Sequence, residues 1–210
     1  MAVKVKFGLS NVHFFPLTEG TSEGVPTMSY GTAIACPGAV NLQLDVSDSE
    51  SDPFYADDSV YYLPAPKASG YSGTLEVAVI PDALKLALMN YKEDEDDVMV
   101  EIAEGKTLYA GMTFEIDTDD KARKLVYYKV QLGTPSLAAS TTEASKTPAT
   151  DTIPVTILPT NKEFTFGTGG NAVTSTVISG YSTPDTDSTV YSGWHTTPHL
   201  PSEPSTQGGG

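Results

Sequence analysis

The sequence predicts a mainly-β protein with one α-helix, an arrangement that fits a β-sandwich or barrel covered by a helix. Apolar and polar residues alternate with a period of two in six segments, which is typical of strands with one buried face. Only one segment has the apolar spacing of an amphipathic helix. No stretch of 18 apolar residues is present that would cross a bilayer, and 210 residues are enough for one domain with its own core.

The six expected strands cover residues 3–7, 40–46, 74–80, 107–117, 123–132 and 152–159. Every second residue from Val40 to Val46 is apolar, so these side chains are expected on one face. The same expectation holds for every second residue from Leu75 to Val79. Pro154 has no backbone N–H, so the last of these strands is expected at the edge of a sheet.

Polar and glycine-rich segments are expected to form turns. "TDDKA" (118–122) separates the two longest strands and predicts a hairpin. "FGTGGNA" (166–172) does not match the G-x-G-x-x-G phosphate-binding pattern and precedes no helix pattern, so it is interpreted as a turn. In "DPFYADDSVYY" (52–62) aromatic residues flank Asp57 and Asp58, and the stretch is interpreted as an acidic turn from which a strand leaves.

"PDALKLALMNY" (81–91) is the segment that predicts an α-helix. Pro81 and Asp82 are typical of the first turn of a helix. The apolar residues that follow share one face at spacings i, i+3, i+4 and i+7, and they are Leu84, Ala87, Leu88 and Tyr91. Because a single amphipathic helix cannot bury its own stripe, we expect it to cover a sheet, with Lys85 on another face.

The chain is strongly acidic, with 27 acidic residues, 12 basic residues and a formal net charge of −15. This charge argues against electrostatic binding of nucleic acid, in which Lys and Arg displace counterions, and against binding to anionic membranes. "KEDEDD" (92–97) holds five consecutive acids, so we expect a solvated loop there. The first ten residues lack the long apolar segment of a signal peptide, which predicts folding in a reducing cytoplasm.

Histidine and cysteine commonly serve catalysis or metal binding, and the chain has three His and one Cys. His195 and His199 have the i, i+4 spacing of a zinc site, but Pro198 breaks the helix that would align the two rings. His13 is expected to be a half-buried strand residue. Cys36 has no partner for an internal disulfide and is expected to be a small buried side chain.

The acidic residues between positions 45 and 58 raise the question of a calcium site. An EF-hand loop that begins at Asp45 needs Gly at its sixth position and Glu at its twelfth, but these positions hold Glu50 and Ala56. The segment is therefore interpreted as an acidic surface loop, with a looser calcium site as the alternative. We expect no catalytic residue, no cofactor-binding residue and no metal site in this chain.

The composition changes near residue 136, where Ser, Thr and Ala become frequent and the apolar period ends. Residues 136–151 are expected to form an extended loop that contacts other subunits. The segment after Thr183 has too little apolar content to fold on itself, so we expect it to gain order only against other subunits. We predict a single domain over residues 1–200, followed by a flexible tail over 201–210.

Five strings along the chain resemble a known family. They are "VKFGLSNVHFFPLT" (5–18), "PGAVNLQLD" (37–45), "FYADDSVYY" (54–62), "GYSGTLEVAVIPD" (70–82) and "VYSGW" (190–194). Together they resemble the phi13-type major tail proteins, the tail tube proteins of long-tailed (siphovirus) bacteriophages of Gram-positive hosts. The third string followed by the fourth is the most specific part. The acidic run 92–97 and the Ser-, Pro- and Gly-rich end depart from typical members.

This resemblance implies two packed antiparallel sheets, nearly a barrel, with a flanking helix and extended arms. It implies a structural virion protein without catalytic residues, assembled in the host cytoplasm as stacked hexameric rings that form the tail tube. The implied partners are other copies of the chain, a tape-measure protein inside the tube, and tail terminator and distal tail proteins at its ends. DNA would pass through the lumen without specific binding, and no membrane is implied. The alternative is a β-sandwich carbohydrate-binding or adhesion module.

Overall fold

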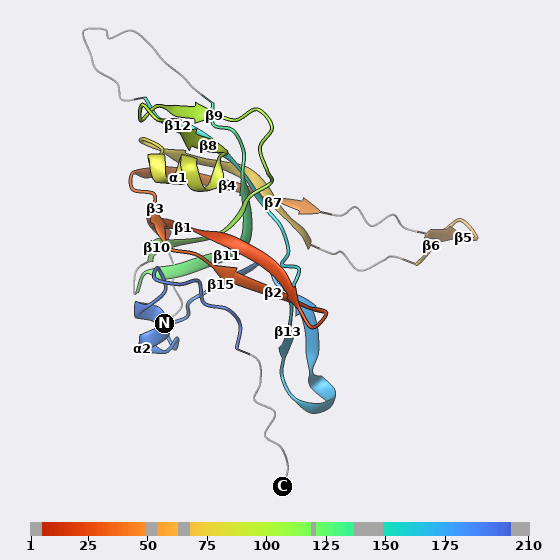
Figure 1. Cartoon of the computed structure of the whole chain (residues 1–210). Coiled ribbons are helices and arrows are strands. Elements are labelled where there is room, and N and C mark those ends of the chain that lie inside the picture. Colours follow the sequence, from red (N-terminus) through yellow and green to blue (C-terminus); the bar gives the residue numbers. More distant parts are fainter. Residues whose placement is uncertain (1–5, 49–53, 63–67, 119–120, 137–148, 203–210) are drawn as a thin grey trace.

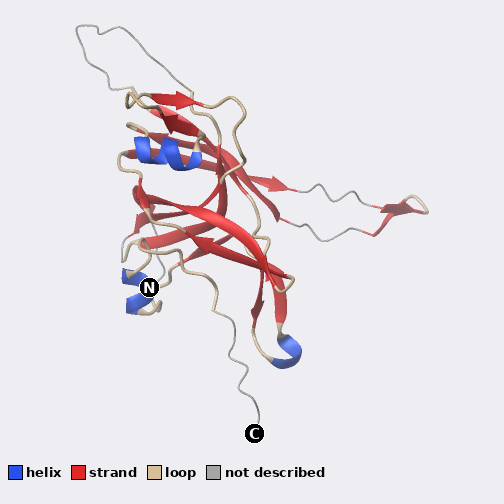
Figure 2. Ribbon diagram, viewed as in Figure 1, coloured by secondary structure: helices blue, strands red, loops and turns tan. Residues whose placement is uncertain are grey.

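The computed structural model describes residues 6–48, 54–62, 68–118, 121–136 and 149–202. The chain is mainly β, as predicted (Figure 2). Its elements are β1 (Lys6–Ser22), β2 (Val25–Tyr30), β3 (Ile34–Ala35), β4 (Ala39–Asp48), β5 (Phe54–Ala56), β6 (Ser59–Tyr62), β7 (Ala68–Val77), α1 (Asp82–Leu88), β8 (Tyr91–Glu93), β9 (Met99–Glu101), β10 (Tyr109–Thr118), β11 (Arg123–Leu132), β12 (Asp151–Ile157), β13 (Glu163–Phe166), the 3-10 turn η1 (Gly169–Asn171), β14 (Val173–Thr176), β15 (Ser179–Tyr181) and α2 (Ser188–Ser192).

Nine of these strands form one antiparallel sheet in place of the two separate sheets that were expected. The strand order is β2-β1-β10-β11-β12-β7-β4, with β15 paired to β11 and β3 paired to β1. The sheet curves so strongly that β1 and β4 approach each other and share one core (Figure 1). Register shifts lie in the β1–β10 and β10–β11 pairs, and such bulges increase local bending.

The hydrophobic core lies inside the curve of the sheet. Alternate residues of β10, namely Ala110, Met112 and Phe114, face it together with side chains of β1, β7 and β12. Cys36 is fully buried in the same core, which confirms its prediction as a small buried residue.

Helix α1 covers this core, but it is shorter than the sequence pattern indicated. Leu84 and Leu88 are buried, as predicted, and Ala87 packs beside them. The helix ends at Leu88 because Asn90 adopts a left-handed backbone conformation with φ of 56°. The Asn90 side chain holds this turn through hydrogen bonds with the backbone of Lys106. Tyr91 therefore begins strand β8 rather than continuing the helical stripe.

Two of the predicted strand faces are wrong at their ends. Val40 and Val46 are more than half exposed, although Leu42 and Leu44 between them pack against the core. Register shifts in the β4–β7 pair lie beside both valines, so the alternation is interrupted there. Val79 is exposed as well, because β7 ends two residues earlier.

The prediction that Pro154 marks an edge strand is also wrong, because β12 lies between β11 and β7. The carbonyl of Pro154 accepts a hydrogen bond from Gly133 N at 2.8 Å, just beyond the last residue of β11, Leu132. The backbone N and C=O of one strand residue point to the same neighbouring strand. The N of Pro154 therefore points toward Gly133, where the pairing of β12 with β11 has already ended. The proline thus interrupts no ladder between the two strands.

Within the described ranges, three hairpins lie outside the main sheet. In β5–β6, Asp57 and Asp58 have φ values of 50° and 55°, as a two-residue type I′ turn requires. This confirms the interpretation of the stretch as a turn that leads into a strand. Residues 166–172 form the glycine-rich turn of β13–β14, again as predicted. The acidic run 92–97 is exposed as expected, but it forms part of the β8–β9 hairpin.

The prediction that the segment after Thr183 cannot order on its own subunit is wrong. Trp194 is buried against Val126 and Tyr128, on the face of β11 that points away from the main core. This segment also forms a second helix, α2, where one helix was expected. Asp187 caps it, because its carboxylate accepts hydrogen bonds from the backbone N–H groups of the first turn. Residues 137–148 and 203–210, which cover most of the expected loop and tail, lie outside the described ranges.

Candidate functional site

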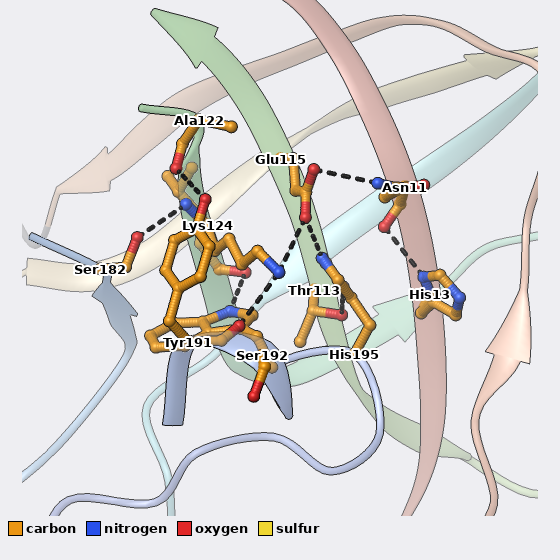
Figure 3. A network of polar contacts seen from close by, with 12 residues as sticks. Asn11, His13, Thr113, Glu115, Ala122, Lys124, Ser182, Tyr191, Ser192 and His195 are labelled. Atoms are coloured by element: carbon orange, nitrogen blue, oxygen red, sulfur yellow. Dashed lines mark hydrogen bonds and ion pairs between the residues drawn. The ribbon is translucent and has the colours of Figure 1, made fainter. Parts of the chain in front are cut away.

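A network of polar side chains, some of them titratable, joins the C-terminal segment to the sheet (Figure 3). It originates in the alternation of β10, where Met112 and Phe114 face the core and Thr113 and Glu115 face the opposite side. The pairing of β10 with β11 places Lys124 directly across from Glu115. We call this group the clasp, and its members are Asn11, Thr113, Glu115, Lys124, Tyr191 and His195.

Glu115 lies at the centre of the clasp. One carboxylate oxygen accepts a hydrogen bond from Asn11 Nδ2 at 2.9 Å, and the other contacts Lys124 Nζ at 3.0 Å and His195 Nε2 at 2.9 Å. Burial raises the pKa of Glu115, but the hydrogen bonds from these three groups outweigh it and hold the pKa below its ordinary value. Glu115 is therefore an ionised acceptor that binds side chains from three parts of the chain.

His195 connects Glu115 to Thr113 across the clasp. Its Nδ1 lies 2.9 Å from the Thr113 hydroxyl, and its ring stacks on that of His13 at 5.0 Å between centroids. Because the ionised Glu115 is only an acceptor, Nε2 carries the proton and Nδ1 accepts from the hydroxyl. Burial lowers the pKa of His195 more than its hydrogen bond to Glu115 raises it. The ring is therefore neutral at pH 7.

Lys124 and Tyr191 hold the other side of the clasp. Lys124 Nζ donates to the Tyr191 carbonyl at 3.0 Å and lies 4.3 Å from the centroid of the Tyr191 ring. The Tyr191 hydroxyl donates to the Ala122 carbonyl at 2.8 Å. The backbone N–H of Lys124 donates to Ser182 Oγ at 2.9 Å. Tyr191 thus attaches helix α2 to the start of β11, and Ser182 adds a contact from the residue that follows β15.

The order Thr113–His195–Glu115 resembles a nucleophile, a base and an orienting acid, but its surroundings do not suit catalysis. A nucleophile must reach its substrate, and Thr113 is fully buried. Lys124 also neutralises Glu115, whose role in such a set is to stabilise a charged imidazole. The arrangement is suited to holding the C-terminal segment on the sheet.

The structure separates the two histidines of the zinc-like spacing. His195 points toward Glu115, whereas His199 stacks on Trp194 at 6.0 Å between centroids. Helix α2 ends at Ser192, so neither histidine lies on a helix. His13 is half-buried in β1, as predicted. Sequence reasoning did not find the clasp, because 80 residues separate Glu115 from His195 and no local pattern links them.

The acidic residues considered for calcium lie in different elements. Asp45 lies in β4 opposite Ser72, whereas Asp57 and Asp58 form the β5–β6 turn. Within the described ranges, no group of three or more His, Cys, Asp or Glu side chains is placed to hold a metal ion. Residues 49–53 of this acidic segment lie outside those ranges, so the absence of a required calcium site stays a prediction.

Removal of calcium is expected to leave the stability of the subunit unchanged. A bound ion stabilises the folded state by mass action, so a chelator would lower the melting temperature only if the site were occupied. We expect EDTA to shift the melting temperature by less than about 2 °C, measured by circular dichroism with calcium-loaded EDTA as the control. A large drop that added calcium reverses would contradict this expectation.

The ends of the main sheet offer a surface for assembly. β2 and β4 stand at the two ends of the strand order, and each exposes apolar side chains, Val25 on β2 and Val40 and Val46 on β4. The outer N–H and C=O groups of an edge strand can pair with another chain. Because the two edges differ, pairing one with the other would join copies head to tail, in a contact that closes a ring or extends a filament.

No protein-family model matches the chain, and a search of curated proteins finds no match either. The resemblance of the five strings to tail tube proteins therefore supports a proposal and not a family assignment. None of the helices in the described ranges has the length and apolar character needed to cross a bilayer.

Acidification is expected to weaken the clasp. The pKa of His195 is lowered in the folded chain, so below its ordinary value of 6.5 the unfolded chain binds more protons than the folded chain. His195 therefore contributes to the free energy of unfolding above pH 6.5, and this contribution is lost as the pH falls from 6.5 through the lowered pKa. The lowered pKa of Glu115 acts in the same direction below pH 4.5.

We expect the melting temperature of the wild type to fall between pH 7.5 and pH 5. His195→Gln keeps an amide that can donate to Glu115 but does not titrate, so its melting temperature should fall less over the same interval. Thermal denaturation followed by circular dichroism across the pH series measures both slopes. Parallel slopes would show that His195 does not carry the effect.

Proposed function

We propose that this chain is a structural virion protein, the subunit of a phage tail tube, and that it self-assembles as stacked hexameric rings. The observation that carries the proposal is the antiparallel sheet with unlike edge strands, β2 and β4, whose outer sides pair with no further strand in the described ranges. A subunit of this kind can extend head to tail around a ring, and the edges stop being free once the ring closes. The five strings that resemble tail tube proteins support the same assignment.

The charge of the chain is consistent with a conduit for DNA. Six copies with −15 each give a ring with a formal charge of −90. A lumen of the same sign as the phosphate backbone would let DNA pass without specific binding. The proposal also includes a tape-measure protein inside the tube during assembly, tail terminator and distal tail proteins at its ends, and location in the virion.

A carbohydrate-binding or adhesion module is the competing function. Tyr61 and Tyr181 are well exposed, and exposed aromatic rings are one requirement of such a module. A module would remain small at high concentration and would bind glycans, whereas a tube subunit would assemble. Size at increasing concentration therefore separates the two functions.

Concentrated protein is expected to form hollow tubes in negative-stain electron micrographs. Like-charged subunits repel one another and salt screens this repulsion, so the tubes should become longer as the salt concentration rises. Tube length is measured over a salt series at fixed protein concentration. A monomer at every concentration, or tubes that dissolve as salt is added, would contradict the proposal.

Deletion of residues 139–148, which lie outside the described ranges, provides a matched comparison. We expect the deleted chain to remain soluble and to keep the far-ultraviolet spectrum of the wild type, because the strands described for the main sheet are all formed by residues on either side of this segment. We expect it to form only short tubes or isolated rings. Long tubes from the deletion would show that this segment makes no essential contact between subunits.

A further inference from the structure

The β8–β9 hairpin carries a row of exposed apolar side chains along its edge. Val98, Val100 and Ile102 alternate along the chain and are 53%, 46% and 41% exposed. Each is β-branched, and together they make one face of residues 98–102 apolar. Such a row on a two-stranded hairpin is costly in water unless another element covers it.

The backbone of β9 is also open on one side. Ile102 N donates to Asn90 O, and Val98 O accepts from Asp94 N, both at 3.0 Å. Val98, Val100 and Ile102 therefore direct their N–H and C=O groups toward the β8 side of the hairpin. The groups of Met99 and Glu101 point to the opposite side, where no strand of the described ranges pairs with them. A further strand can add there.

The pattern of side chains specifies the kind of strand that would fit. One face of the edge is apolar, and the other carries Met99 and Glu101, on the same hairpin as the acidic turn of residues 94–97. A complementary strand needs apolar residues alternating with basic ones. The chain has only 12 basic residues, and two of them, Lys4 and Lys6, alternate with valines at its start.

We propose that residues 2–5 of a second copy add as a strand to the free edge of β9. In an antiparallel register, Val3 faces Ile102, Lys4 faces Glu101 and Val5 faces Val100. In this register each valine lies beside an apolar side chain and Lys4 lies beside an acidic one, on the same face of the extended hairpin. The inference deepens the proposed function, because it names one contact between copies in the assembly.

The partner is a second copy because the same chain is badly placed to supply this strand. Within one copy, Lys6 pairs with Thr118 at the end of β10. Figure 1 shows α1 between the start of β1 and the β8–β9 hairpin. Five residues span at most about 18 Å, a short reach for crossing a helix with its side chains. A contact between the start of one copy and the β8–β9 hairpin of another is head to tail, as growth of a tube requires.

Disulfide trapping between two variants tests the contact directly. A chain with Val3→Cys is mixed with a chain that carries Ile102→Cys, under assembly conditions, and oxidised. The native Cys36 is fully buried and contributes little background. We expect a cross-linked dimer on a non-reducing gel. Val173→Cys in place of Ile102→Cys is the control, because Val173 is similarly exposed on a different hairpin and should give little dimer.

A charge exchange tests the register. Lys4→Glu places an acid opposite Glu101 and should raise the protein concentration needed for assembly by about tenfold. Adding Glu101→Lys to this variant should restore most of the loss. Failure of the second change to restore assembly would overturn the register.

The outcomes separate this inference from the proposed function. Tubes that form without the Val3→Cys to Ile102→Cys cross-link would overturn the inference and leave the tube function standing. A cross-link within a single double-substituted chain would overturn the assignment to a second copy. A chain that stays monomeric at every concentration would overturn both.

Discussion

Replacement of Leu88 by Asp is expected to abolish folding of the subunit. Leu88 is 4% exposed, and with Leu84 it attaches α1 to the core. Truncation of such a leucine to alanine already costs about 2–5 kcal/mol, and an unpaired buried charge costs more. Domains of this kind are stable by only about 5–15 kcal/mol. Soluble expression and the circular dichroism spectrum of Leu88→Asp measure the outcome.

Lys85→Asp is the matched control on the same helix. Lys85 Nζ forms an ion pair with Asp82 at 3.0 Å on the solvent side of α1. The change removes this pair and adds repulsion, so it should cost less than about 1 kcal/mol. If Leu88→Asp melted at the same temperature as the wild type, the apolar face of α1 would not be part of the core.

Local alternation was enough to predict much of the sheet. The bounds expected for residues 123–132 coincide with those of β11, and β10 and β12 lie within two residues of the expected ranges. Leu75 and Val77 are buried on one face, as the period of two indicated. These predictions were correct because both the strand and its buried face follow from a short-range pattern.

The binding site for the C-terminal segment depends on a bulge that no short-range pattern reveals. In the first half of β11 the odd-numbered Leu125 and Tyr127 contact the main core, whereas in the second half the even-numbered Val130 does so. Between these positions the pairing with β10 shifts register, so β11 changes the side that it presents to the core. Val126 and Tyr128 are thereby left on the opposite face, where Trp194 covers them.

The outer face of β11 that this bulge creates is the reason why the prediction for the C-terminal segment is wrong. The segment has too few apolar residues to form a core of its own. Instead, the segment packs Trp194 on the apolar face of β11 and contributes Tyr191 and His195 to the clasp. The residues that Tyr191 and His195 contact in the clasp come from β10 and β11, more than 60 residues earlier in the chain. Composition cannot indicate such a docking site.

Trp194→Ala is the second change with a large expected effect. Trp194 is 3% exposed, and its Nε1 donates to the Leu125 carbonyl at 3.1 Å. Its loss would open a cavity over Val126 and Tyr128, and truncation of a buried tryptophan costs about 3–5 kcal/mol. For a chain of this length this corresponds to a fall of about 10 °C in melting temperature.

Two further variants show whether the effect comes from docking on the chain's own sheet. Trp194→Phe keeps one aromatic ring in the site but loses the indole N–H and part of the apolar contact, so it should cost clearly less than Trp194→Ala. Tyr181→Ala removes an exposed aromatic ring from neighbouring β15 and should have a small effect. All three are measured at low protein concentration, where copies do not associate. If Trp194→Ala then melted like the wild type and lost stability only in assembled tubes, the segment would be held by neighbouring subunits and not by β11.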